Sequence, residues 1–174
     1  VNQEVGPIND EYSHRTAASN FVAAASNSKG LIGAAPDAQL ILIKQSLISD
    51  STTNASVEYA RIMGAKVINC SWGTPGGPSA AVTAKINELK ADGINIVFSA
   101  GNDNADLDDP SQNDDSELAG VIGIGSTSSE NDRSSFSNYG SAMDIMAPGG
   151  GLVGVLSAFV PNTEHDVTTN GLDI

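Results

Sequence analysis

The chain has 174 residues, of which 40% are hydrophobic and 5% aromatic. This composition excludes a disordered tail and allows one domain with a core, built from closely packed elements joined by many turns. Its 21 acidic and 8 basic residues give a net charge of −13, which excludes phosphate backbones and anionic membranes as partners. The acidity suits a soluble secreted protein, a salty environment, or binding of a hard cation such as calcium; solvated acidic loops are the plainer interpretation.

Cys70 is the only cysteine, so the chain has no internal disulfide. It ends an apolar run that begins at Val67, where a small buried side chain is expected rather than a nucleophile or a metal ligand. No apolar run approaches the length of a membrane span. The chain opens without Met or a signal sequence, so we expect it to begin after a boundary of processing or expression.

Helical stretches and short apolar runs alternate along the chain. Helices are expected over residues 15–25, 54–63 and 79–91, and the last has the clearest amphipathic pattern. Buried strands are expected over residues 38–44, 66–70, 94–99, 121–125 and 143–146, followed by a hairpin arm over 153–160. This alternation predicts an α/β fold of three layers, with a mostly parallel sheet covered by helices on both faces, as a single domain over residues 1–174.

Two features locate a candidate site. His14 comes at the expected start of the first helix, where a histidine can reach a cleft and act as a general base; a solvated or helix-capping histidine is the alternative. Ligands of open parallel sheets bind beyond the carboxyl ends of the strands. The segments that follow the expected strands are rich in small, turn-forming and amide-bearing residues: Ser71-Trp72-Gly73, Gly101-Asn102 and Pro148-Gly149.

Several stretches, in this order, resemble the subtilisin-like serine proteases, the subtilases. Residues 10–19 (DEYSHRTAAS) are similar to the motif His-Gly-Thr-x-Val-Ala, and residues 33–40 (GAAPDAQL) to Gly-Val-Ala-Pro-x-Ala-x-Leu. Residues 67–73 (VINCSWG) resemble Val-Ile-Asn-x-Ser-x-Gly, and residues 96–102 (IVFSAGN) resemble a strand that ends in Ala-Gly-Asn. Residues 135–140 (SFSNYG) and 146–149 (MAPG) match Phe-Ser-x-x-Gly and Ala-Pro-Gly. Together they cover most of the chain, which makes the resemblance specific.

The resemblance implies a subtilisin-like serine endopeptidase domain that hydrolyses peptide bonds in proteins. His14 would be the general base, and Asn102 would donate its side-chain amide to the oxyanion; without the motif, Asn102 would be read as a turn residue. The walls of the pocket for the residue that precedes the scissile bond would be Ser71, Trp72, Gly73, Ala100 and Gly101. For Trp72, a position in the core is an equally good interpretation.

Two parts of the family's catalytic triad have no match in the sequence. The family's aspartate stands upstream of the histidine in an Asp-Ser/Thr-Gly setting, and Asp10 is too close to His14, on an expected loop, to replace it. The nucleophile belongs to Gly-Thr-Ser-Met-Ala, a string that does not occur here. Either residues 170–173 (NGLD) take its place, which puts Asp173 where the serine belongs, or the chain stops at Ile174 before reaching it. Arg15 also replaces the glycine that follows the histidine.

Other implied features concern metals and partners. Calcium rigidifies loops in subtilases and would be the structural cofactor here; the acidic residues 103–117 could bind it, but their spacing is not that of an EF-hand and leaves the ligands unknown. His165 has no ligand-type neighbour, so we expect a surface role. Partners would be a protein or peptide substrate and a second chain or fragment that completes the sheet, with no nucleic acid and no membrane.

The sequence therefore predicts part of the catalytic domain of a secreted, extracellular subtilisin-like serine endopeptidase, inactive as this chain alone. A catalytically dead relative that binds peptides in the same cleft is the alternative, and Asp173 in the place of the serine would be its mark. A structural α/β domain that shares only the framework is a third possibility.

Overall fold

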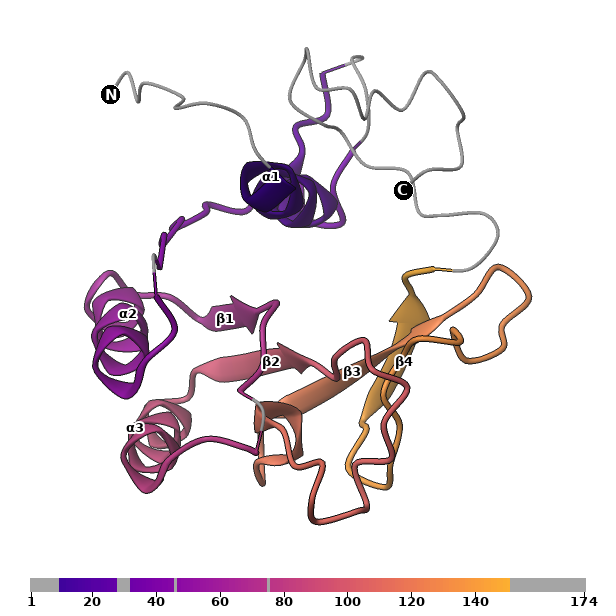
Figure 1. Cartoon of the computed structure of the whole chain (residues 1–174). Helices are drawn as coiled ribbons and strands as arrows, with labels where there is room; N and C mark the ends of the chain where they lie inside the picture. Colours follow the sequence, from indigo (N-terminus) through magenta and orange to yellow (C-terminus); the bar gives the residue numbers. More distant parts are fainter. Residues whose placement is uncertain (1–9, 28–31, 46, 75, 151–174) are drawn as a thin grey trace. The chain divides into compact units, whose positions relative to one another are not determined.

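A computed structural model describes residues 10–27, 32–45, 47–74 and 76–150 (Figure 1). The chain divides into two compact units, one of residues 1–40 and 152–174 and the other of residues 41–151. The expected hairpin arm at 153–160, His165 and the 170–173 stretch lie outside the described residues. Within the described ranges, no helix is long and apolar enough to cross a membrane.

The first unit contains helix α1 (Asp10–Ala23) and the segment that folds back onto its end. The amide of Gly33 donates to the carbonyl of Ala24 at 2.9 Å, and Ala34 donates to Phe21 at 2.9 Å. A Cβ atom on Gly33 would lie 2.6 Å from the Ala23 nitrogen, so only glycine permits this approach. Helix α1 begins five residues earlier than expected. His14 is therefore one turn inside the helix rather than at its start, and Asp10 opens the helix instead of standing on a loop.

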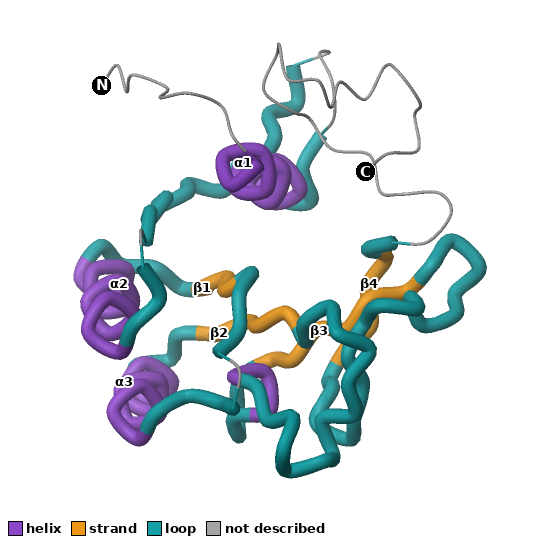
Figure 2. Tube along the Cα trace, viewed as in Figure 1, coloured by secondary structure: helices purple, strands orange, loops and turns teal. Residues whose placement is uncertain are grey.

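The second unit is built on a sheet of four parallel strands, β1 (Val67–Cys70), β2 (Asn95–Ser99), β3 (Ile122–Thr127) and β4 (Ile145–Pro148). They lie side by side in the order β1-β2-β3-β4 (Figures 1 and 2). In the register, Cys70 pairs with Phe98, and Phe98 pairs with Gly123. The predicted parallel sheet is confirmed.

Helices α2 (Asp50–Ile62) and α3 (Ala80–Ala91) pack on this sheet through a shared core. Each begins at a serine: the Ser49 side chain accepts from the Thr52 amide in a capping box, and the Ser79 side chain accepts from the Val82 amide at 3.2 Å. The core contains Val57 from α2, side chains from the inner face of α3, and strand residues of β1 and β2; its buried members are Val57, Cys70, Val82, Ile86, Leu89, Ile94, Ile96, Phe98 and Val121.

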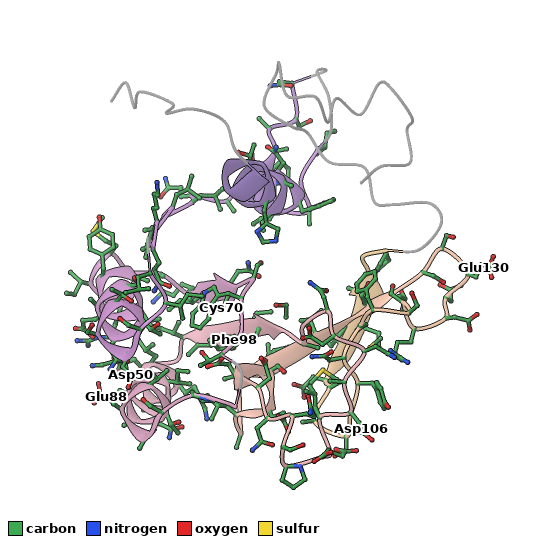
Figure 3. All side chains as sticks on the ribbon, viewed as in Figure 1. Asp50, Cys70, Glu88, Phe98, Asp106 and Glu130 are labelled. Carbon is green, nitrogen blue, oxygen red and sulfur yellow. The ribbon has the colours of Figure 1, made fainter. Side chains whose placement is uncertain are left out.

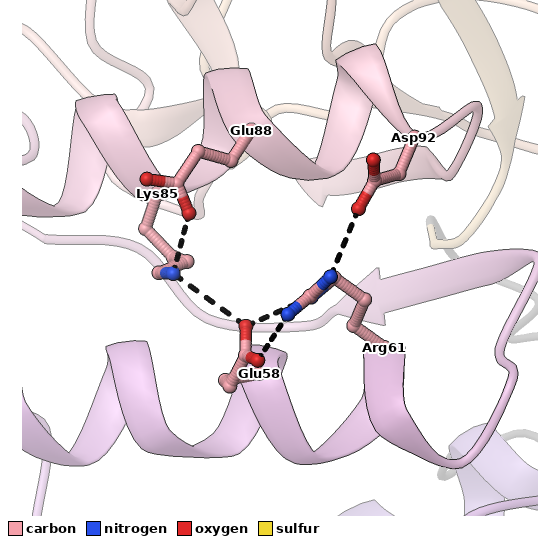
Figure 4. Close-up of polar contacts among 5 residues, drawn as sticks. All are labelled: Glu58, Arg61, Lys85, Glu88 and Asp92. Carbon is pink, nitrogen blue, oxygen red and sulfur yellow. Dashed lines mark hydrogen bonds and ion pairs between the residues drawn. The ribbon is translucent and has the colours of Figure 1, made fainter.

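A chain of ion pairs joins the outer surfaces of α2 and α3 (Figure 4). Glu58 on α2 pairs with Arg61 one turn later and with Lys85 of α3 at 3.5 Å. Arg61 reaches Asp92 at 3.2 Å, and Lys85 reaches Glu88 at 2.5 Å. These groups are partly exposed to solvent, so salt screens them, and the buried core supplies most of the packing energy between the helices.

The prediction of a buried strand at residues 38–44 is wrong. These residues have no regular secondary structure and form no ladder with the four described strands, and Leu42 is 74% exposed. An apolar run predicts burial, but a strand also needs a neighbour that accepts its backbone hydrogen bonds. Within the described sheet, β1 pairs only with β2, and none of the four described strands forms a ladder with this segment.

Candidate functional site

The loops that follow β1 and β2 lie next to each other at the carboxyl edge of the sheet. Cys70 pairs with Phe98, so the segments Ser71–Thr74 and Ala100–Asn102 leave neighbouring strands at the same level. Figure 3 shows Cys70 and Phe98 close together at this position. The structure thus brings together the predicted wall residues of the peptide pocket, in the place where parallel sheets bind ligands.

Trp72 is held at this edge by the core beneath it. Its ring meets the Phe98 ring edge-on, with centroids 5.3 Å apart and planes at 84°. The residue is half-buried and packs against the core cluster. Trp72 therefore packs against the core, as its alternative interpretation predicts, and its exposed part is available to a ligand.

The loop after β2 is fixed by Asn138, a buried amide. Its Oδ1 accepts hydrogen bonds from the backbone amides of Asp103 and Ala105, both at 2.9 Å, and its backbone N–H donates to the Gly101 carbonyl at 3.2 Å. Gly101 has φ +95°, and a Cβ there would lie 2.6 Å from Asn138 Nδ2. Ala100 is buried and donates to Ile124 at 2.8 Å. Asn102 is thereby held exposed, with its loop anchored on both sides.

Arg133 supports the same loop from its outer side. Its guanidinium donates to Asn104 Oδ1 at 2.8 Å and to the Ser137 carbonyl at 2.5 Å, and it lies 4.5 Å from the centre of the Tyr139 ring. Asn104 has φ +53°, an uncommon conformation that the arginine contact helps to hold. The exposed amide of Asn102 is therefore presented by a restrained loop.

The loop after β1 packs against two neighbouring aspartates. Asp115 is 0% exposed, and its Oδ2 accepts from the Thr74 amide at 2.5 Å. Asp114 is half-buried and caps a short 3-10 helix (Asp115–Glu117) by accepting from the Ser116 amide at 3.0 Å. A Cβ on Gly73 would lie 2.2 Å from Asp114 Oδ2, so any larger residue here would displace this carboxylate.

The acidic stretch 103–117 divides into two parts. Asp106, Asp108 and Asp109 are exposed, and each accepts hydrogen bonds from the loops: Asp108 from Ser141 at 2.7 Å and Asp109 from the Ser111 amide at 2.9 Å. These hydrogen bonds hold the pKa values of Asp108 and Asp109 below their usual range. A solvated loop thus describes this part, but not the buried Asp115.

The structure leaves the expected calcium binding by the acidic stretch as a prediction. Within the described ranges, no three His, Cys, Asp or Glu side chains gather as a metal site would require. The calcium ligands stay unknown, and no step below depends on calcium.

His14 is exposed on helix α1, in the first unit. The five wall residues and Asn102 belong to the second unit, so six of the seven predicted site residues lie in one unit. His14 belongs to the other unit. The roles of all seven stay predictions.

Sequence reasoning missed Asn138 and Asp115 as parts of this site. Asn138 stands inside the Phe-Ser-x-x-Gly stretch, at a variable position of the motif, so no pattern marks it. Asp115 is one of six aspartates in a polar stretch and looks solvated. No pattern in the sequence separates Asp115 from the exposed aspartates beside it.

The model of the Subtilase family, Peptidase_S8, matches residues 3–172. The chain belongs to the subtilase family. Subtilisin NAT of Bacillus subtilis subsp. natto is 33% identical over 156 residues, which are 86% of this chain and 40% of that protein. Subtilisin Savinase of Lederbergia lenta is 34% identical over 145 residues, 80% of this chain and 52% of that protein. The chain thus spans about half or less of the length of these relatives.

Solved structures agree on the fold of this subtilase. A protease of Pseudoalteromonas arctica PAMC 21717 gives a TM-score of 0.67 at 30% identity and covers 76% of this chain and 42% of that one. The PatG macrocyclase domain gives 0.73 at 22% identity, covers 87% of this chain and 45% of that one, and so shows the fold alone. The predicted family and the three-layer α/β fold class are confirmed, and the chain is part of a serine-type protease domain by family.

Proposed function

We propose that this chain supplies the general base, the oxyanion donor and one wall of the substrate cleft to a subtilisin-like serine endopeptidase. The observation that supports this most strongly is the restrained Gly101–Ala105 loop, which presents Asn102 beside the Ser71–Thr74 segment. A peptide would lie along these two segments with its scissile carbonyl at Asn102. The amide of Asn102 would then stabilise the oxyanion that forms when the carbonyl is attacked.

In this proposal His14 removes the proton of the nucleophile and returns it to the leaving amine. The sequence contains no Gly-Thr-Ser-Met-Ala string to supply the serine and no Asp-Ser/Thr-Gly setting upstream of His14. Hydrolysis therefore needs an aspartate and a serine that the positions matched to the family motifs do not supply. The acidic composition supports an extracellular setting, and the bound partner is a peptide or protein substrate.

The test uses the complete product of the gene that encodes this chain, assayed on a fluorogenic peptide. We expect His14→Ala to lower kcat/KM by about 10⁴-fold or more, and Asn102→Ala by about 10²–10³-fold, a range established on a subtilisin. His165→Ala, a change of the other histidine, is the matched control and should leave the rate within about twofold. The 174-residue chain alone should show no turnover above its own His14→Ala variant. Full activity in His14→Ala would contradict the proposal.

A peptide-binding module without catalysis is the second candidate. The observation that favours it is Asp173, which takes the place of the serine if residues 170–173 correspond to Asn-Gly-Thr-Ser. The two candidates separate in the same assay, because the module binds peptides but gives no turnover in the complete gene product.

A further inference from the structure

The side chain of Met146 in β4 lies against the backbone of Gly125 in β3. The two residues are partners in the parallel register of these strands, so both side-chain positions belong to the same face of the sheet. A Cβ added to Gly125 would lie 2.9 Å from Met146 Cε and closer still to Met146 Sδ. The thioether therefore occupies the space that the missing side chain of Gly125 leaves free.

This contact lies one residue from a hydrogen bond that anchors the candidate site. The carbonyl of Ile124, which precedes Gly125 in β3, accepts a hydrogen bond from the Ala100 amide at 2.8 Å. Ala100 is buried and begins the loop that carries Asn102. A displacement of β3 at Gly125 would therefore reach the anchor of this loop.

A small oxidant in the solvent can reach Met146, whereas the only thiol of the chain is protected. Met146 is 39% exposed, and Cys70 is buried. Peroxides react with the thiolate form of cysteine, and burial raises the pKa of Cys70 to about 12, so this thiol stays protonated near neutral pH. A thioether needs no ionisation to react, so the exposure of Met146 leaves its sulfur open to oxidation.

We propose that Met146 is a site of reversible oxidation by peroxide, and that its sulfoxide loosens the pairing of β3 with β4 beside the candidate site. Hydrogen peroxide transfers one oxygen atom to the sulfur: its O–O bond breaks, an S–O bond forms, the sulfur gives up two electrons, and the other oxygen leaves as water with both protons. The new oxygen is polar and attracts hydrogen-bond donors, whereas the sulfur faces the packed backbone of Gly125. The oxidised side chain must therefore leave this position to be solvated.

The experiment leaves one methionine at a time in the 174-residue chain, which has three, Met63, Met143 and Met146. One double variant, Met63→Leu with Met143→Leu, keeps Met146 alone. The matched control, Met143→Leu with Met146→Leu, keeps Met63, which is 54% exposed at the end of α2. Leucine has nearly the volume of methionine and no sulfur to oxidise. Each chain is treated with hydrogen peroxide, peptide mass spectrometry locates the added oxygen, and circular dichroism measures Tm.

We expect the chain that keeps Met146 to gain one oxygen atom there and to lose at least about 3 °C in Tm, whereas the chain that keeps Met63 loses less than about 1 °C when equally oxidised. In the unmodified chain, methionine sulfoxide reductases A and B with dithiothreitol should restore the lost Tm, a measurement that needs no variant. The inference is overturned if Met146 gains no oxygen under conditions that oxidise Met63, or if oxidised Met146 leaves Tm unchanged. A loss that the reductases do not reverse would place the damage at Cys70 and would overturn it as well.

Discussion

Asn138 shows how one buried side chain determines the shape of the candidate site. A single amide oxygen accepts two backbone donors of the Gly101–Ala105 loop, and the backbone of Asn138 adds a third bond to Gly101. The residue touches no predicted catalytic group, so its role is to position the loop that carries Asn102. A sequence motif records such a residue only as a variable letter, because the motif does not say which side chains turn inward.

Replacement of this residue by alanine should loosen the loop. Asn138→Ala leaves the amides of Asp103 and Ala105 without their acceptor, and we expect the free energy of unfolding to fall by about 2–3 kcal/mol. Urea denaturation followed by circular dichroism measures this loss. Asn102→Ala, in the same loop but exposed, is the control and should change stability by less than about 0.5 kcal/mol. Equal effects of the two variants would show that the Asn138 side chain does not hold the loop.

Asp115 gives a prediction about pH with a definite sign. Its pKa is raised in the folded protein by burial, with the half-buried Asp114 shifted the same way. A folded state that holds its proton more tightly is favoured at low pH, so this contribution is fully present below the ordinary aspartate pKa and is lost as pH rises through the raised value. Asp114, Glu117 and the Cys70 thiol are the titratable groups around it.

Removal of the charge should therefore stabilise the protein near neutral pH. We expect Asp115→Asn to raise the free energy of unfolding by about 1 kcal/mol at pH 7, with the gain vanishing near pH 3, where the wild-type aspartate is protonated. Asp109→Asn is the control with the opposite sign, because hydrogen bonds lower the pKa of Asp109 and favour its charged form. Thermal unfolding at both pH values tests the pair; a gain that persists at pH 3 would contradict burial as the cause.

At the scale of elements, the sequence predicts the second unit well and its boundaries less well. The apolar spacing places α2, α3 and all four strands of the sheet within a few residues, because their patterns reflect burial directly. The start of α2 was expected at residue 54 but lies at Asp50, since the capping box at Ser49 consists of hydroxyl residues that carry no apolar pattern. The 38–44 stretch fails for the opposite reason, because its pattern is apolar but none of the four described strands pairs with it.

The cap of α3 offers a direct test at this scale. Ser79→Ala removes the side chain that accepts from the Val82 amide, and we expect a loss of about 1 kcal/mol in the free energy of unfolding. Ser79→Asp keeps a capping acceptor and should retain most of the stability. Urea unfolding of both variants measures the difference. A loss as large for aspartate as for alanine would show that the hydroxyl does something other than cap the helix.

At the scale of the whole molecule, the family and the fold follow from the order of the motifs, whereas the site does not follow completely. Motif spacing identifies the strand ends, and parallel pairing of those strands brings Trp72 and Asn102 to one edge of the sheet. The positions of Asp115 and Asn138 depend on which side chains turn inward, and a single sequence does not give that information. His14 is assigned by resemblance, on a helix of the other unit.

The most direct test of the account is a nitrogen–proton NMR titration of the labelled chain with Ala-Ala-Pro-Arg amide. The amide signals of residues 71–74 and 100–102 should shift together and saturably, because the peptide would lie along both loops. The amides of α2 and of the outer face of α3 serve as the internal reference and should stay in place. Shifts confined to the helices, or no shifts at the two loops at millimolar peptide, would contradict the proposed cleft.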